Sequence, residues 1–98
     1  PRLDIDTLIA LRRSTDFPLV IHGGTGLGED VVRKLVASGG SKFNLSTQIK
    51  QTYIDALDEY IRAHRQEYDI LKVLQHAYQG LREMIGGYMA LLGSEGKA

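Results

Sequence analysis

Cysteine is absent from this chain of 98 residues, and its charges cancel, with 12 lysines and arginines against 12 aspartates and glutamates. Without cysteine there is no disulfide framework, which fits a reducing compartment. A formal net charge of zero gives no electrostatic reason to expect a nucleic acid or an anionic membrane as partner. The printed residues contain no signal-peptide pattern and no apolar run of membrane-spanning length. We therefore expect a cytoplasmic protein that binds neither nucleic acid nor membrane.

The length is that of one small domain. The chain starts at Pro1, without a methionine, and runs at once into helical patterning. We therefore expect it to be a piece of a longer protein.

The stretch from Pro18 to Gly26 is the most informative part of the chain. Its apolar run, 19–21, is rich in β-branched residues and predicts a short strand buried on both faces. His22 follows at once, and then Gly23-Gly24-Thr25-Gly26. Glycine permits the positive φ angles of a concave backbone nest, so this loop is suited to bind a phosphate through its N–H groups.

The rest of the chain alternates helices and strands. Asp4 or Asp6 is expected to cap a first helix that runs out around 14–16. A second helix opens at Glu29 and stops at Gly39-Gly40. A second strand is expected at 41–45, and a third helix over about 48–67, capped by Ser46 or Thr47.

This order is typical of an α/β architecture with parallel strands and right-handed crossovers. Two strands do not make a stable parallel sheet by themselves, and an eight-stranded barrel takes roughly 250 residues. We therefore predict the C-terminal part of a (β/α)8 TIM barrel, with its last two βα units in residues 1–68. Residues 69–98 are predicted to be a C-terminal helical arm and tail of the same domain.

The last segment carries a heptad seam. Its apolar positions alternate spacings of four and three: Ile70, Leu74, Ala77, Leu81, Met84, Tyr88 and Leu91. Gly80, Gly86 and Gly87 interrupt the seam, so the helix is expected either to approach another backbone closely or to break at 86–87. One interpretation is a helix packed on its own domain, and the other is a subunit-contact arm.

The chemistry is expected where the strands end. In a parallel barrel the carboxyl ends of the strands share one face, so His22, the glycine loop, Asn44, Ser46 and Thr47 should converge. The N-terminus of the third helix would add its positive dipole end.

Each of these residues also has a plain structural interpretation. His22 can be a hydrogen-bonded structural residue, Asn44 can satisfy backbone groups, and Ser46 or Thr47 can simply cap the helix. His64 and His76 lie within helices, and we expect a solvent or packing role for both.

The two motifs at the strand ends resemble those of a known family. His22-Gly23-Gly24-Thr25-Gly26 and 42–47, Lys-Phe-Asn-Leu-Ser-Thr, are similar to the paired motifs of class II, zinc-dependent ketose-bisphosphate aldolases, which act on fructose or tagatose 1,6-bisphosphate. The closing residues 91–98 are also similar to the tail of that family. The resemblance covers nearly the whole chain, and the two motifs at this spacing are specific together.

The resemblance implies a role for each matching position. His22 would be one zinc ligand, and Asn44 would hydrogen-bond the ketose or its enediolate. The substrate and its phosphate would be bound by Gly23, Gly24, Thr25, Asn44, Leu45, Ser46 and Thr47. Fructose-specific members often have an aspartate at the position of Ser46. This difference points away from the fructose-specific branch of the family. The other zinc histidines and the acid/base residue would lie upstream, so no catalytic acid/base residue is expected in this chain.

The implied function is that of a lyase of carbohydrate metabolism such as glycolysis. It would cleave or form a ketose bisphosphate through dihydroxyacetone phosphate, with Zn²⁺ as cofactor, in a homodimer or homotetramer joined by the C-terminal helices. Because one histidine cannot hold a catalytic zinc, these 98 residues alone are expected to be inactive. The alternatives are a non-catalytic module for phosphate binding or helix-mediated association, and a phosphate-binding barrel enzyme that needs no metal.

Overall fold

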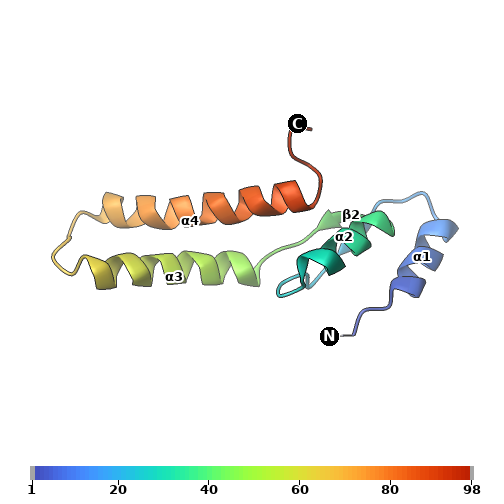
Figure 1. Ribbon diagram of the computed structural model, residues 1–98, viewed down its shortest axis with the longest axis horizontal. Coiled ribbons are helices and arrows are strands. Elements are labelled where there is room, and N and C mark those ends of the chain that lie inside the picture. The colour runs from blue at the N-terminus through green and yellow to red at the C-terminus, as the bar shows by residue number, and fades with distance from the viewer. Residues whose placement is uncertain (1, 98) are drawn as a thin grey trace. The chain divides into compact units, whose positions relative to one another are not determined.

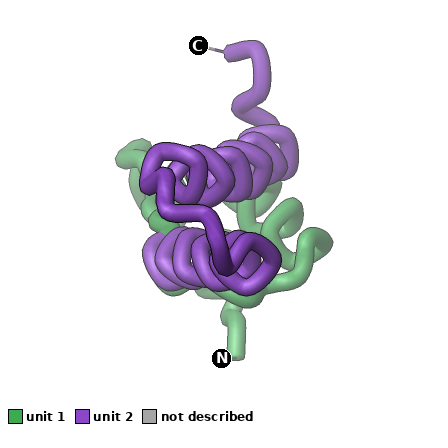
Figure 2. Tube along the Cα trace, turned by 90° about the vertical axis from the view of Figure 1, so that its left-hand side faces the viewer, with its two compact units in different colours: residues 1–45 green, residues 46–98 purple. Residues whose placement is uncertain are grey.

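The computed structural model describes residues 2–97, and six elements follow one another along the chain (Figure 1). Their order is α1 (Ile5–Ser14), β1 (Leu19–Ile21), α2 (Glu29–Ala37), β2 (Gly40–Phe43), α3 (Thr47–Ala63) and α4 (Ile70–Leu91). The chain divides into two compact units, residues 1–45 and 46–98 (Figure 2).

Unit 1 is a βαβ arrangement preceded by a helix. β1 and β2 pair in parallel, with Val20 opposite Lys42 and Ile21 opposite Phe43, and α2 makes the crossover between them. The apolar face of α2 forms most of the core: Val32 is fully buried and Leu35 nearly so, while Leu8 of α1 is buried as well. The two strands and their crossover helix show a fragment of an α/β fold.

Local sequence explains where the helices of unit 1 begin and end. The Asp4 carboxylate caps α1, accepting from the Thr7 backbone N–H at 2.9 Å and from its hydroxyl at 2.7 Å. These two bonds hold the pKa of Asp4 below its ordinary value, because they stabilise the charged form. At the other end of the unit, α2 stops because Gly39 takes a φ of +119°, which favours glycine.

Unit 2 is a helical hairpin. Figure 1 shows α3 and α4 lying side by side, and they run in opposite directions, since Gln48 at the start of α3 accepts a hydrogen bond from Tyr88 near the end of α4. Ala56 and Ala77 are buried between the helices. A Cβ added at Gly80 would lie 3.5 Å from the Ala56 Cβ, so small residues let the helices come close at this point.

The turn of the hairpin is held by a chain of polar contacts. Glu67 accepts from the Asp69 backbone N–H at 3.0 Å, and Asp69 in turn caps α4 by accepting from the Leu71 N–H at 3.0 Å. Lys72 reaches back to Glu67 at 3.3 Å. The Asp69 N–H, followed by Lys72, lowers the pKa of Glu67, and Glu67 raises the pKa of Lys72. α3 ends at Ala63, with His64 as its C-cap, and not near 67 as the sequence had suggested.

Several expectations from sequence are confirmed and others are wrong. The first helix, its Asp4 cap, the strand at 19–21 and the glycine stop of α2 are confirmed. β1 is not buried on both faces, because Val20 is 42% exposed and, within the described residues of unit 1, β2 is the strand paired with it. β2 spans Gly40–Phe43 and not 41–45, because the chain leaves the ladder after Asn44 to enter α3.

The predicted heptad seam is buried or half-buried in the C-terminal part of α4 only. Ile70 and Leu74 are exposed, at 71% and 41%, whereas Ala77, Leu81, Met84, Tyr88 and Leu91 are buried or half-buried. The buried residue of α4 is the small Ala77, and Gly80 one turn later lies against Ala56 of α3. Gly86 and Gly87 do not break α4, which continues to Leu91.

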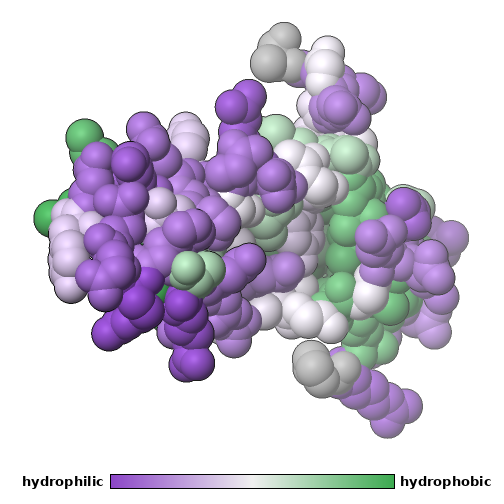
Figure 3. Space-filling view, turned by 60° about the vertical axis from the view of Figure 1, so that its left-hand side comes forward, coloured by the Kyte–Doolittle hydropathy of each residue, from purple (hydrophilic) through white to green (hydrophobic). Residues whose placement is uncertain are grey.

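Large apolar side chains also reach the surface, in patches among polar areas (Figure 3). On α4 the exposed ones recur at helical spacing, at Leu71, Leu74, Tyr78, Ile85 and Met89. None of the helices in the described part of the chain combines the length and apolar character needed to cross a membrane.

Candidate functional site

His22 and Asn44 are brought together by the parallel ladder. β1 ends at Ile21 and β2 at Phe43, so each polar residue directly follows its strand. The Asn44 backbone N–H donates to the Ile21 carbonyl oxygen at 3.0 Å, which continues the ladder by one step. The Asn44 side-chain nitrogen Nδ2 then lies 3.3 Å from Nδ1 of the His22 ring. The expected convergence of these two residues is therefore present.

The glycine loop has the backbone that the sequence predicted. Gly23 and Gly26 take φ angles of +70° and +82°, both in the region that favours glycine. Gly24 between them is buried, and a Cβ added there would lie 3.1 Å from Cδ1 of Phe43. Thr25 is half-buried. The loop thus turns tightly against the end of β2, with little side-chain bulk over its amide groups.

Ser46 and Thr47 belong to unit 2, where they begin α3. Both are exposed, and Ser46 stands at the N-cap position, with its carbonyl oxygen accepting from the Lys50 N–H at 3.1 Å. The Ser46 side chain makes no capping hydrogen bond. Ser46 therefore occupies the expected N-cap position, but its hydroxyl does not cap the helix. The first N–H groups of the helix and its positive dipole end lie beside two hydroxyl-bearing residues.

The described residues, 2–97, contain no group of three or more His, Cys, Asp or Glu side chains that could hold a metal. His64 and His76 pack in unit 2: His64 stacks on Tyr60 with ring centroids 4.2 Å apart, and the His76 ring lies 5.2 Å from the same tyrosine. The solvent or packing role expected for both histidines is confirmed. His22 is exposed at its strand end, and the other two histidines of the chain belong to unit 2.

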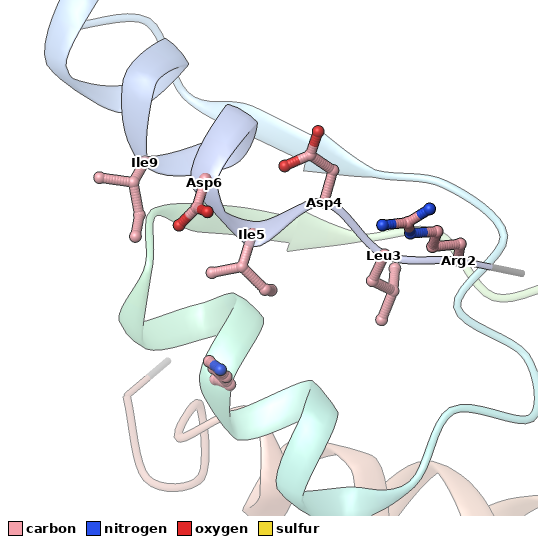
Figure 4. Close-up of a pocket in the computed structure, with 7 residues that line it drawn as sticks. Arg2, Leu3, Asp4, Ile5, Asp6 and Ile9 are labelled. Atoms are coloured by element: carbon pink, nitrogen blue, oxygen red, sulfur yellow. The ribbon is translucent and has the colours of Figure 1, made fainter.

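A separate hollow of about 690 Å³ lies beside the start of α1 (Figure 4). Its lining mixes charged and apolar side chains: Arg2, Leu3, Asp4, Ile5, Asp6, Ile9 and Lys34. None of the site residues expected from sequence lines it, and the Asp4 carboxylate is already engaged by Thr7. The candidate site therefore lies at the strand ends and not in this hollow.

Sequence reasoning missed two residues that shape these regions. Phe43 lies against Gly24, and its place as the one large apolar residue of β2, directly before Asn44, is the signal that would have suggested this contact. Tyr88 was assigned to an apolar seam, whereas its hydroxyl donates to Gln48 across the hairpin. A tyrosine in a half-buried seam usually finds a polar partner, which is the signal for that contact.

Comparison with known proteins places this geometry in context. The family model of class II fructose-bisphosphate aldolase matches residues 1–97. The crystal structure of the YdjI aldolase from Escherichia coli K12 is similar over the whole chain, with a TM-score of 0.87 and 23% sequence identity. The chain covers 36% of that aldolase chain. On the family match, this chain belongs to the class II fructose-bisphosphate aldolase family.

Proposed function

We propose that this chain is the C-terminal part of a zinc-dependent class II aldolase that cleaves or forms a ketose bisphosphate through dihydroxyacetone phosphate. The observation that carries the proposal is the contact between His22 and Asn44 beside a glycine loop with positive φ angles. Residues 1–68 would be the last two βα units of a (β/α)8 barrel, and residues 69–98 its helical arm. The family match over residues 1–97 supports this assignment.

The phosphate would be bound by backbone and hydroxyl donors. Gly23, Gly24 and Thr25 would present N–H groups and one hydroxyl, while Ser46 and Thr47 would add hydroxyls at the start of α3. Leu45 would contact the substrate, and the Asn44 amide would donate to a sugar oxygen. Holding the phosphate remote from the reacting carbon lets its binding energy orient that carbon, which raises the rate.

His22 fits zinc as one ligand of a larger set. A catalytic zinc uses about three protein ligands, and this chain offers a single exposed imidazole at the strand end. Zinc, when bound, supplies a Lewis acid for the ketone oxygen. Because the remaining ligands and the acid/base residue would lie elsewhere in the barrel, the 98 residues alone are proposed to be inactive.

The test uses the full-length protein that carries this chain. Cleavage of fructose 1,6-bisphosphate and of tagatose 1,6-bisphosphate is measured before and after treatment with a chelator, and again after Zn²⁺ is returned. We expect activity that the chelator abolishes and zinc restores, with the tagatose compound preferred because Ser46 replaces the aspartate of fructose-specific members. If the cleavage rate is unchanged by the chelator, the zinc mechanism is wrong.

A matched pair of histidine variants tests the ligand. His22→Ala is expected to lose bound zinc and cleavage, whereas His64→Ala is expected to retain both, since His64 stacks on Tyr60 in unit 2. If His22→Ala keeps its zinc and its rate, the ligand assignment is wrong. Zinc content is measured by atomic absorption, and circular dichroism separates loss of metal from loss of fold.

A second function, helix-mediated association, is favoured by the exposed apolar residues of α4. Tyr78, Ile85 and Met89 line a hollow of about 440 Å³ on that helix, together with Leu81, Arg82 and Gly86. We propose that this face joins copies of the protein into a homodimer or homotetramer. Light scattering of wild type and Ile85→Glu tests it: we expect the variant to have a lower mass, and an unchanged mass would contradict the proposal.

A further inference from the structure

The His22–Asn44 contact engages one particular ring nitrogen. Asn44 Nδ2 lies 3.3 Å from His22 Nδ1, and the Asn44 backbone is fixed to the same strand end through Ile21. A side-chain amide nitrogen donates and does not accept, so Nδ1 must offer its lone pair. The neutral ring then carries its proton on Nε2. The ring nitrogen that has a lone pair available for a metal is therefore the one that Asn44 covers.

We propose that Asn44 is a positioning residue that occupies the His22 Nδ1 lone pair in the metal-free protein and gives it up when zinc binds. The same amide would then be free to donate to the sugar phosphate, so occupancy of the metal site and readiness of Asn44 for substrate are coupled. This inference rests on the proposed function. It adds that the metal and the Asn44 amide compete for one atom.

If Asn44 competes with the metal, removing it changes metal affinity in the opposite direction from removing a residue that supports the ligand. A residue that orients a metal ligand weakens metal binding when it is removed, commonly by about 10- to 100-fold. A residue that competes for the lone pair strengthens metal binding when it is removed. Since the hydrogen bond it makes is long and the ring is exposed, we expect Asn44→Ala to bind Zn²⁺ about two- to fivefold more tightly.

The experiment uses the full-length protein, stripped of metal and labelled with ¹⁵N-histidine. Wild type is compared with Asn44→Ala, with Asn44→Asp and with the control Ser41→Ala on the same strand. The His22 ring signals are assigned by their loss in His22→Gln. Zinc affinity is measured by competition with a chromophoric chelator, and the tautomer of His22 is read from its two ring ¹⁵N shifts.

We expect wild type and Ser41→Ala to show an unprotonated, hydrogen-bonded Nδ1. Asn44→Ala should move that signal toward a free imidazole nitrogen, and Asn44→Asp, whose carboxylate only accepts, should place a proton on Nδ1. The inference is overturned if Nδ1 of the wild type is protonated, or if Asn44→Ala binds zinc more weakly or equally. If only this inference fails, zinc-dependent cleavage is still observed. If the proposed function fails, cleavage is absent, while the ring signals of the metal-free protein still respond to substitution of Asn44.

Discussion

Gly24 lies against Phe43, so that a Cβ added at Gly24 would stand 3.1 Å from Cδ1 and 3.4 Å from Cε1 of that ring. The contact joins the middle of the glycine loop to the last residue of β2. An added methyl group would be closer to the ring than ordinary van der Waals contact allows, so either the loop or the ring would have to shift. The loop conformation and the end of β2 therefore depend on each other.

The first prediction follows from that contact. Gly24→Ala should shift the loop by a few tenths of an ångström and raise the KM for the sugar bisphosphate by about tenfold or more, because misplaced binding groups lose much of their effect. Gly28→Ala is the matched control, since nothing lies within 4 Å of a Cβ there. Steady-state kinetics of the full-length protein check it, and equal KM values for the two variants would contradict it.

The second prediction concerns Gly39, which ends α2 with a φ of +119°. A Cβ there would meet the Arg12 side chain at 2.7–2.9 Å. Gly39→Ala should therefore lower the free energy of unfolding by about 1–3 kcal/mol, through backbone strain and crowding. Gly96→Ala, with a φ of +71° but nothing within 4 Å, separates crowding from strain. Urea unfolding measures both, and an unchanged midpoint for Gly39→Ala would refute the argument.

The third prediction concerns the hydrogen bond from Tyr88 to Gln48, which ties the open end of the hairpin and is partly buried. Tyr88→Phe should lower the free energy of unfolding by about 0.5–1.5 kcal/mol, since it removes one intramolecular hydrogen bond. Tyr78→Phe removes a hydroxyl from a side chain that is 68% exposed, and should change little. Thermal unfolding by circular dichroism compares the two, and a larger loss for Tyr78→Phe would count against the bond.

The fourth prediction is a pH dependence at the start of α1. The pKa of Asp4 lies below its ordinary value of 3.8 because the Thr7 hydroxyl and N–H donate to the carboxylate. A carboxylate with a lowered pKa stabilises the fold above its unfolded pKa, and that stabilisation is lost as the pH falls through the folded value. The free energy of unfolding should therefore differ most between wild type and Asp4→Ala near neutral pH. This difference should become smaller on acidification below about pH 4. Unfolding curves between about pH 5 and pH 2 test this, and a difference that grows in acid would contradict it.

Local patterns in the sequence were sufficient for most helix and strand positions. Asp4 before an apolar face predicted the start of α1, three consecutive apolar residues predicted β1, and Gly39 predicted the end of α2. These features act within a few residues, through capping bonds and allowed φ angles. The same local reasoning failed at the end of α3, where Glu67 and Lys72 hold the turn together, because that choice depends on the helix that folds back.

The candidate site divides in the same way. The sequence placed His22, the glycine loop and Asn44 at strand ends, because a parallel βαβ unit puts those ends at one edge. It could not tell that the Asn44 amide reaches Nδ1 of His22, or that Phe43 closes against Gly24. Those contacts depend on the register of the two strands and on side-chain rotamers.

The sequence by itself determined the order of elements, the glycine loop and the family motifs, since each is set by short-range chemistry along the chain. Only the tertiary structure decided which face of α4 packs inward. The small residues Ala56 and Ala77 are buried in the hairpin and Gly80 lies against Ala56, while Ile70 and Leu74 are exposed. Packing between elements selects one rotation of a helix among several that its own apolar pattern allows, and that selection depends on residues more than twenty positions apart.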